Sequence, residues 1–328
     1  MIRASISGVA GWVPEDKLTN QDFEQLVQTN DAWIVERTGI RERRILKTKE
    51  GSSYLGAKAV ERLLDKMQLP VEEIDALICA TITPDMMFPN TANQICYKIG
   101  AKQIPAFDVL AACSGFLYAL EIGSSMIATG KYKKIVVVGA DKMSSITNYE
   151  DRSHCILFGD AAGAVLLEPS QDDNGIIDLR IKSDPVGKDM IYLKAGGSAH
   201  PASFDTVLHK EHYFFQDGKS VYKYAVTHMA QIAKEVMQAN NLSVEDLDYL
   251  IPHQANQRII EAVARMADIP TEKVCSNIER YGNTTAATIP LCLWEWEKDF
   301  RKGQNIVLAA FGAGFTWGAC YLRWAYNA

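Results

Sequence analysis

The sequence contains 328 residues, a length that corresponds to about two domains of ordinary size. Its 34 Lys and Arg against 40 Asp and Glu give a net charge of −6, which argues against a general nucleic-acid binder. No apolar run is long enough to cross a membrane, and the seven Cys are scattered without the spacing of a disulfide scaffold or zinc ribbon. We therefore expect a soluble, cytoplasmic protein whose cysteines are free thiols.

Strand-like and helix-like segments alternate along the first half of the chain. Apolar runs predict strands, and helical spacing of apolar residues predicts helices, of which the first should be capped by Ser52. Gly100 and Gly130 are expected to end the second and third helices. The predicted strands are 4–9, 76–82, 107–111, 135–138 and 164–167, and the predicted helices are 52–68, 90–100 and 114–129. This order favours an α/β fold with buried sheets.

Three segments of the first half are repeated in the second half in the same order. LPVEEIDALI (69–78) matches LSVEDLDYLI (242–251), and a predicted helix precedes each, at 52–68 and 219–239. KKIVVVGAD (133–141) resembles QNIVLAAFG (304–312), and GAVLL (163–167) resembles GACYL (318–322). The repeats predict one duplication, with an N-terminal half at 1–172 and a C-terminal half at 173–328.

Residues 183–218 show no clear periodicity and are expected to form an inserted loop rich in Gly, Pro, His and aromatic residues. His209 and His212 have a spacing that a metal ion could use, but two imidazoles without a third ligand are more often surface residues. We therefore expect no metal site.

Cys113 differs from the other six cysteines in its surroundings. In DVLAACSGF (108–116) a predicted strand passes directly into an apolar helix, which places the thiol at the helix N-terminus. The positive end of the helix dipole favours a thiolate there, and the small neighbouring residues permit a tight turn. The other six cysteines lie in ordinary apolar segments and are interpreted as packing residues.

Polar groups also follow the repeated strands of the second half. His253 comes directly after a buried strand, Asn283 lies in a turn before a helix that Thr284 could cap, and FGAGFTWGA (311–319) is a glycine-rich turn whose N–H groups could face an oxyanion. Active sites of α/β proteins gather at such strand ends. A Cys, a His and an Asn fit either a cysteine hydrolase or an acyltransferase, and spacing does not separate the two.

These motifs together resemble the β-ketoacyl-acyl carrier protein synthase III family. The resemblance rests on DVLAACSGF, HQAN (253–256), YGNT (281–284), FGAGFTWG (311–318), NDAWIVERTGIRERR (30–44) and LFGDAAGAVLLEP (157–169), and it covers essentially the whole chain. It implies a thiolase-like fold of two duplicated halves in five αβαβα layers, and a homodimer.

The resemblance also implies roles for individual residues. Cys113 corresponds to the acyl-accepting nucleophile, His253 and Asn283 to the pair that supports decarboxylation, and the N–H groups of Cys113 and Ala313 to the oxyanion hole. Phe88 corresponds to a residue that crosses the dimer to the acyl pocket. Positions that contact coenzyme A or its pantetheine arm in the family are Trp33, Arg37, Thr38, Arg152, Asn256 and Arg258.

The implied reaction joins an acyl-CoA to malonyl-acyl carrier protein, releases CoA and CO₂, and initiates fatty acid synthesis without a metal or other cofactor. Two alternatives remain: a related enzyme of a polyketide or quinolone pathway, and an acyl-CoA-binding homologue without catalysis. Threonines replace common serines in YGNTTAATIP, and Gln216 stands where an apolar residue is expected. The long 183–218 loop leaves the preferred starter open.

An acidic protein that binds an acidic carrier protein needs a local basic surface. Arg258 and Arg265 are seven residues apart and so lie on one helix face, while Lys219 and Lys223 begin the helix at 219–239. We predict that these four residues form the docking patch, the alternative being an ordinary solvated helix face.

Overall fold

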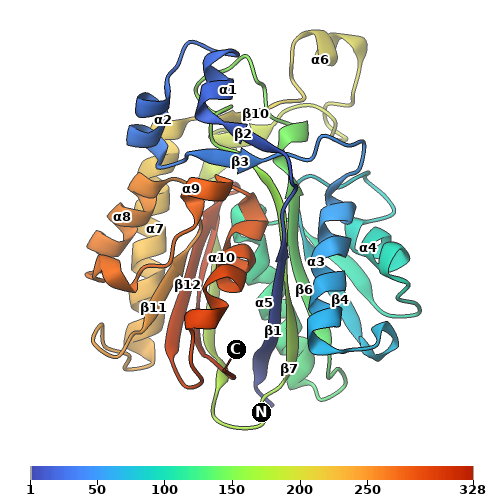
Figure 1. The fold of residues 1–328 in the computed structure, drawn as a ribbon, viewed down its shortest axis with the longest axis vertical. Coiled ribbons are helices and arrows are strands. Elements are labelled where there is room, and N and C mark those ends of the chain that lie inside the picture. The colour runs from blue at the N-terminus through green and yellow to red at the C-terminus, as the bar shows by residue number, and fades with distance from the viewer. Residues whose placement is uncertain (1, 328) are drawn as a thin grey trace.

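Two β-sheets stand side by side in the computed structural model, which describes residues 2–327, and helices lie on both faces of each sheet (Figure 1). The first sheet has the order β1-β7-β6-β4-β5. Its strands are β1 (Ala4–Trp12), β7 (Asp160–Pro169), β6 (Ile135–Lys142), β4 (Ala76–Ala80) and β5 (Ala106–Val109). The second sheet has the order β11-β12-β13-β8, with strands β11 (Tyr249–Pro252), β12 (Asn305–Gly312), β13 (Thr316–Arg323) and β8 (Gly175–Ser183).

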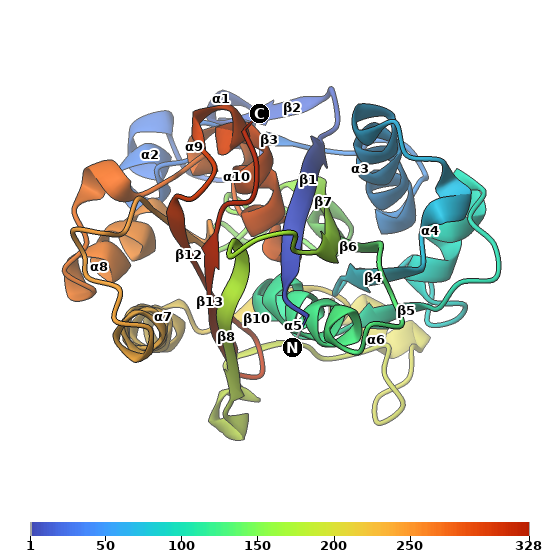
Figure 2. The same ribbon diagram turned by 90° about the horizontal axis from the view of Figure 1, so that it is seen from below.

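The helices divide into three layers around these sheets. Helices α5 (Gly115–Ala128) and α10 (Thr288–Trp296) lie between the sheets and share one apolar core with both. Helices α3 (Ser52–Met67) and α4 (Thr91–Ile99) cover the outer face of the first sheet, and α7 (Gly218–Ala239) and α8 (Gln257–Met266) cover the outer face of the second. The view in Figure 2 shows the same succession of layers. The predicted five-layered αβαβα architecture is therefore confirmed.

The repeated segments occupy equivalent places in the two sheets. In the first sheet β4 runs parallel to β6, and β6 runs antiparallel to β7. In the second sheet β11 runs parallel to β12, and β12 runs antiparallel to β13. The boundary at 172/173 stays a prediction; it falls in the connection between β7 and β8.

Most local signals in the sequence have the structural meaning expected of them. Asn90 caps α4 by accepting the N–H of Asn93 at 2.8 Å, and Gly100 ends the helix in the left-handed region at φ 85°. The predicted Ser52 cap is wrong. Helix α3 begins at Ser52 itself, and Asp85 of a distant loop accepts the N–H of Ser53 at 2.9 Å.

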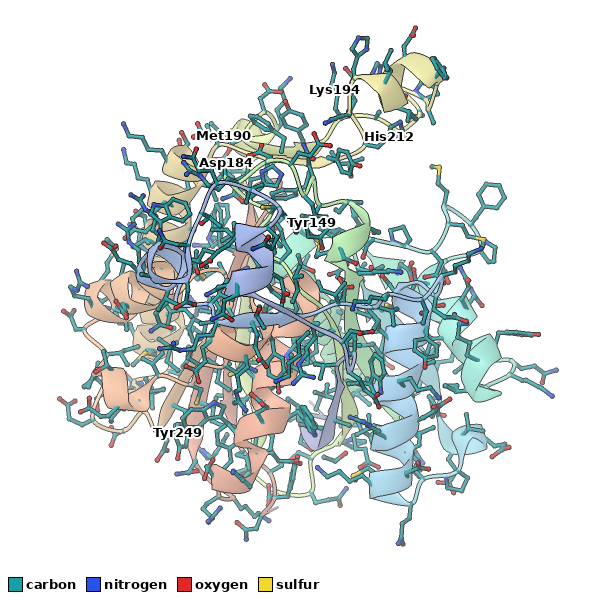
Figure 3. All side chains as sticks on the ribbon, turned by 45° about the horizontal axis from the view of Figure 1, so that its top comes forward. Tyr149, Asp184, Met190, Lys194, His212 and Tyr249 are labelled. Carbon is teal, nitrogen blue, oxygen red and sulfur yellow. The ribbon has the colours of Figure 1, made fainter. Side chains whose placement is uncertain are left out.

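Residues 184–217, here called the arm, contain more regular structure than predicted. Strands β9 (Ile191–Leu193) and β10 (Phe214–Gln216) pair antiparallel, and the short helix α6 (Phe204–Leu208) lies between them in sequence. In Figure 3 Lys194 and His212 stand clear of the body of the molecule, and Asp184 and Met190 lie closer to it. The strands are only three residues long, so their period-two pattern is too short to detect.

Smaller elements complete the chain. A two-stranded ribbon of β2 and β3 lies at the end of the sheets near α1 and α2 (Figure 1). The remaining elements are β2 (Lys17–Thr19), α1 (Asn20–Glu24), α2 (Asp31–Thr38), β3 (Glu42–Arg44), α9 (Ile278–Tyr281) and the 3-10 turns η1 (Val71–Glu73), η2 (Ala112–Ser114), η3 (Met143–Ser145), η4 (Pro185–Gly187), η5 (Thr271–Lys273), η6 (Thr285–Ala287) and η7 (Glu297–Asp299). Within residues 2–327, no helix is long and apolar enough to span a bilayer.

Candidate active site

Cys113 lies in a tight turn between β5 and α5. The turn is the 3-10 segment η2, and Ala112 within it has a φ of 47°, in the left-handed region that non-glycine residues seldom adopt. Cys113 is the one partly exposed cysteine; the other six are buried free thiols, as predicted. The strained turn therefore presents the thiol to a pocket at the N-terminus of α5.

The expected thiolate is not what the surroundings favour. Burial raises the pKa of the Cys113 thiol to about 12, and the carboxylate of Asp141 adds to the rise. The thiol's contact with its own backbone N–H acts in the opposite direction but is weaker. Burial therefore favours the neutral thiol over the thiolate that the helix N-terminus alone predicts.

His253 follows β11 and is held from two sides. Its backbone N–H donates to the carbonyl of Ala309 at 2.7 Å, and its Nδ1 lies 2.7 Å from the hydroxyl of Thr288. Burial lowers the pKa of His253 from 6.5 to about 3, so the imidazole is neutral over the physiological range. A buried neutral His can donate or accept a hydrogen bond through Nε2 but carries no charge.

Asn283 is oriented by its own turn. The N–H of Thr285 donates to the side-chain oxygen of Asn283 at 2.9 Å, which leaves the Nδ2 amino group free to donate elsewhere. The Asn283 backbone is fixed as well, since its N–H donates to Leu157 and its carbonyl accepts the N–H of Gly159. Thr284, the predicted helix cap, makes no cap hydrogen bond.

Asp141 is a fully buried carboxylate beneath this turn that the sequence analysis missed. It accepts hydrogen bonds from Thr81, Ile82 and Thr83 after β4 and from Thr285 and Ala286 after Asn283. Burial raises the pKa of Asp141, while these donors favour the charged form. The sequence feature that could have pointed to Asp141 is a lone acidic residue at the end of the apolar run VVVGAD (136–141).

The glycine turn after β12 closes against Cys113. A Cβ placed on Gly312 would lie 2.7 Å from the backbone N of Cys113, so only glycine permits this approach. Ala313 follows and lines the same pocket. The backbone of the turn therefore lies next to Cys113, the predicted nucleophile, as the oxyanion hypothesis requires.

One pocket of about 560 Å³ brings these groups together. Cys113, His253, Asn283 and Ala313 line it, along with Trp33, Arg37, Thr38, Asn256, Arg258 and Lys219. The guanidinium groups of Arg37 and Arg152 lie over the ring of Trp33 of α2, 5.1 Å and 4.9 Å from its centroid. The pocket thus runs from a basic, aromatic mouth to a buried polar end.

Comparison with known proteins identifies the family. Models of the 3-oxoacyl-[acyl-carrier-protein] synthase III family match residues 107–185 and, for its C-terminal part, 237–324. The chain is 50% identical over 327 residues to a beta-ketoacyl-[acyl-carrier-protein] synthase III of Phocaeicola vulgatus, covering 99% of this chain and 98% of the relative. This chain belongs to the β-ketoacyl-[acyl-carrier-protein] synthase III family.

Further relatives show the same likeness over the full length. A beta-ketoacyl-[acyl-carrier-protein] synthase III of Chlorobium chlorochromatii is 51% identical, with 98% of this chain and 100% of the relative covered. A crystal structure of the 3-oxoacyl-[acyl-carrier-protein] synthase III of Aquifex aeolicus VF5 aligns with a TM-score of 0.90 at 41% identity, covering 98% of this chain and 100% of that one.

Two residues expected to contact coenzyme A in this synthase III family use their side chains inside the protein. Asn256 caps α8 by accepting the N–H of Arg258 at 2.9 Å and donates to the carbonyl of Arg37 at 3.0 Å. The Thr38 hydroxyl donates to the carbonyl of Ile34 at 2.7 Å. Both residues line the pocket, but their polar side-chain atoms are hydrogen-bonded to the backbone of the protein.

The other expected site residues lie outside the pocket lining. Phe88 is 85% exposed on the loop before α4 and is absent from the pocket of its own chain. Arg152 does not line the pocket itself. Its guanidinium lies over the ring of Trp33, which does, and donates to the carbonyl of Gln28 at 2.8 Å. Lys223 and Arg265 are exposed on α7 and α8.

His209 and His212, whose spacing a metal ion could use, both lie on the arm. His212 Nε2 lies 2.8 Å from the Thr206 hydroxyl, and His209 is exposed. Among residues 2–327, no group of three or more His, Cys, Asp or Glu side chains is placed to hold a metal ion. Those histidines are interpreted as surface and structural residues of the arm.

Proposed function

We propose that this synthase III family member catalyses decarboxylative condensation of an acyl-CoA with malonyl-acyl carrier protein, and that Cys113, His253 and Asn283 carry the chemistry. The proposal is supported by relatives at about 50% identity over the full chain, which bear the name of this activity. The observation that carries it is the gathering of a thiol, a neutral imidazole and an oriented amide in one pocket.

In the first half of the proposed reaction Cys113 sulfur attacks the thioester carbonyl of an acyl-CoA. A C–S bond to Cys113 forms, the bond to coenzyme A breaks, and the proton of the Cys113 thiol ends on the departing CoA sulfur. The N–H groups of Cys113 and Ala313 face the oxyanion of the tetrahedral intermediate. The close approach of Gly312 to the Cys113 backbone supports this role.

In the second half malonyl-acyl carrier protein loses CO₂, and the electron pair of the broken C–C bond moves into the thioester enolate. His253 Nε2–H and the Asn283 amide donate hydrogen bonds to the enolate oxygen. The carbanion carbon then attacks the acyl-Cys113 carbonyl, the new C–C bond forms, and the C–S bond to Cys113 breaks. The Cys113 thiolate released takes up one proton from solvent to restore the thiol. Two neutral donors in a buried site stabilise developing negative charge strongly, so this mechanism uses no metal or bound cofactor.

The mouth of the pocket fits a nucleotide thioester. Trp33, with the guanidinium groups of Arg37 and Arg152 over its ring, brings an aromatic side chain and two cations together, the groups that bind an adenine and its phosphates. Arg258 and Lys219 line the same pocket. We assign coenzyme A and the pantetheine arm to this end, with Thr38 and Asn256 shaping the channel.

Carrier-protein docking is assigned to Arg258, Arg265, Lys219 and Lys223. All four are exposed on the packed helices α7 and α8, and among the described residues none forms a salt bridge. Unpaired cations beside the pocket attract an acidic partner. If Arg258→Glu together with Arg265→Glu left turnover with malonyl-acyl carrier protein unchanged, this assignment would be wrong.

A homodimer across the edge of the first sheet accounts for the position of Phe88. Met87, Phe88 and Leu110 are 76%, 85% and 78% exposed, and Leu110 directly follows the edge strand β5. Such an apolar patch next to an open strand edge suits a second copy of the chain. Sedimentation should give a dimer that Leu110→Asp weakens; a wild-type monomer at micromolar concentration contradicts the proposal.

The decisive test of the reaction is to weigh the intact protein after incubation with acetyl-, branched and longer acyl-CoAs. Wild type and Cys96→Ala, whose thiol lies on α4, should gain the mass of one acyl group, and Cys113→Ala should gain none. No mass gain with any acyl-CoA would refute the proposed activity. The fraction of protein that each acyl-CoA acylates in a fixed time also ranks the starters. The sequence of the long arm does not determine this preference.

Adding the second substrate separates the remaining alternatives. Turnover of the acyl-enzyme by malonyl-acyl carrier protein supports initiation of fatty acid synthesis. Turnover by free malonyl-CoA alone would favour the polyketide- or quinolone-type reaction. Stable binding of acyl-CoA without acylation would favour a non-catalytic binding protein.

A further inference from the structure

Thr288, the first residue of α10, lies directly behind the imidazole of His253. Its Oγ1 is 2.7 Å from His253 Nδ1, and both side chains are buried, with 1% and 2% of their surface exposed. Within residues 2–327, this hydroxyl is the one hydrogen-bond partner of the His253 ring. Nε2 is therefore the ring nitrogen left to face the pocket that His253 lines.

The Thr288 hydroxyl has one proton and two acceptors within reach. One is His253 Nδ1, and the other is the carbonyl of Thr285 at 2.9 Å. That carbonyl already accepts the backbone N–H of Thr288, and among the described residues Nδ1 has no hydrogen-bond partner other than this hydroxyl. If Nδ1 carried the imidazole proton, it would donate to Oγ1 and the hydroxyl would donate to the Thr285 carbonyl; if Nε2 carries it, the hydroxyl donates to Nδ1 across the shorter of its two contacts. The hydroxyl is the group that can satisfy Nδ1 as a buried acceptor, so its presence supports the tautomer with the proton on Nε2.

We propose that Thr288 is the positioning residue that donates its hydroxyl proton to His253 Nδ1 and so keeps the imidazole proton on Nε2. This inference rests on the proposed decarboxylation, which needs Nε2–H as a donor to the enolate oxygen. In the opposite tautomer Nε2 presents a lone pair, which repels the developing negative charge. A neutral His in the wrong tautomer costs an enzyme heavily even when its position is unchanged.

The same short segment orients the second donor. The N–H of Thr285 holds the Asn283 side-chain oxygen and thereby turns the Nδ2–H group outward. Residues 285–288 thus determine which atoms both catalytic side chains present, although neither Thr285 nor Thr288 touches the reacting carbon. The first turn of α10 and the 3-10 turn before it act as one positioning device.

Thr288→Val removes the hydroxyl and keeps the shape, and Thr288→Ser keeps the hydroxyl. The matched control is Thr284→Val, because Thr284 is 1% exposed and its hydroxyl has no hydrogen-bond partner within residues 2–327. We expect Thr288→Val to lower the rate of malonyl decarboxylation and condensation at least about tenfold, the equilibrium value of one buried hydrogen bond. Thr288→Ser and Thr284→Val should stay within about threefold of wild type.

The two half-reactions distinguish positioning from general damage. Acylation of Cys113, followed by intact mass, should be nearly unchanged in Thr288→Val, because it does not use the imidazole proton, while decarboxylation falls. Equal loss in both half-reactions would show a merely structural role. Unchanged decarboxylation in Thr288→Val would refute the proposal.

The tautomer itself can be observed without any activity. In protein labelled with ¹⁵N-histidine, the two ring nitrogens of His253, assigned by comparison with His253→Gln, should report a proton on Nε2 and none on Nδ1. Thr288→Ser should give the same pattern, and Thr288→Val should lose it. A proton on Nδ1 in the wild type would overturn the inference. Since this readout needs no turnover, failure of the proposed reaction is separable from failure of the tautomer assignment.

Discussion

Gly312 shows how one missing side chain sets the geometry at the nucleophile. An alanine Cβ there would lie 2.7 Å from the Cys113 backbone N and 3.1 Å from that of Ser114, and backbone atoms in a strained turn cannot move aside cheaply. Gly312→Ala should therefore displace the proposed oxyanion donors and slow acylation of Cys113 about a hundredfold, the usual effect of losing one such donor.

The measurement is a time course of acyl-enzyme formation by intact mass. Gly197→Ala is the control, because no atom lies within 4 Å of a Cβ at that position of the arm. Acylation by Gly312→Ala at the wild-type rate, with the protein folded, would mean that the glycine turn does not contribute to the oxyanion site.

The sequence identified which cysteine lines the pocket but not the protonation state of its thiol. The helix N-terminus is a local feature and can be read from DVLAACSGF. The raised pKa of Cys113 comes from burial and from Asp141, a residue 28 positions away whose proximity only the fold creates. The tautomer of His253 depends likewise on Thr288, which no spacing rule connects to HQAN.

At the scale of elements, Asp141 at the end of β6 connects the loop after β4 with the turn before α10. Six donors converge on its two oxygens, from Thr81, Ile82, Thr83, Thr285 and Ala286. Asp141→Ala leaves these buried donors without an acceptor, so we expect the free energy of unfolding to fall by at least about 3 kcal/mol.

Urea unfolding provides the measurement. Thr285→Val, which removes one of the six donors, should cost only about 1 kcal/mol and remain measurable if Asp141→Ala does not fold. Glu61→Gln, in the part-exposed pair with Lys58, is the control and should change stability by about 0.5 kcal/mol or less. A loss below 1 kcal/mol in Asp141→Ala would show that water replaces the carboxylate.

Elements whose boundaries depend on nearby residues were predicted well. Helix α4 begins after Asn90 and ends at Gly100, as its cap and stop signals indicate. The start of α3 was assigned to the wrong capping residue, because its cap comes from Asp85, more than thirty residues away. The arm was missed because three-residue strands and a five-residue helix are stabilised by tertiary contacts and carry no periodic pattern of their own.

At the scale of the whole molecule, the duplication explains where the site lies. Strands β6 and β12 are equivalent and each leads to the site, β6 to Asp141 and β12 to Gly312. The repeated segments in the sequence were sufficient to predict two related halves. The packing of the halves into five layers was predicted only from the family resemblance, since nothing in a repeat indicates how its two copies pack; in the structure they meet around α5 and α10.

The buried His253 also makes the stability of the whole protein depend on pH. The unfolded chain binds a proton at this residue as pH falls through 6.5, whereas the folded chain does so only near 3. A lowered folded-state pKa of a base thus contributes stability that is present above 6.5 and lost as the pH falls. Burial raises the pKa of Asp141 and Asp160, which acts in the opposite direction, so a comparison of variants is needed to isolate His253.

We predict that wild type loses about 1.6 kcal/mol more than His253→Gln between pH 6.5 and pH 5, because the unfolded His is half protonated at pH 6.5 and each further pH unit approaches about 1.4 kcal/mol. Urea unfolding at both pH values measures the difference, and His209→Gln on the exposed arm should follow the wild type. Equal pH dependence in wild type and His253→Gln would mean that the imidazole takes up its proton in the folded protein. His253 would then enter the reaction charged below pH 6.5, and the condensation rate would fall along the same titration curve.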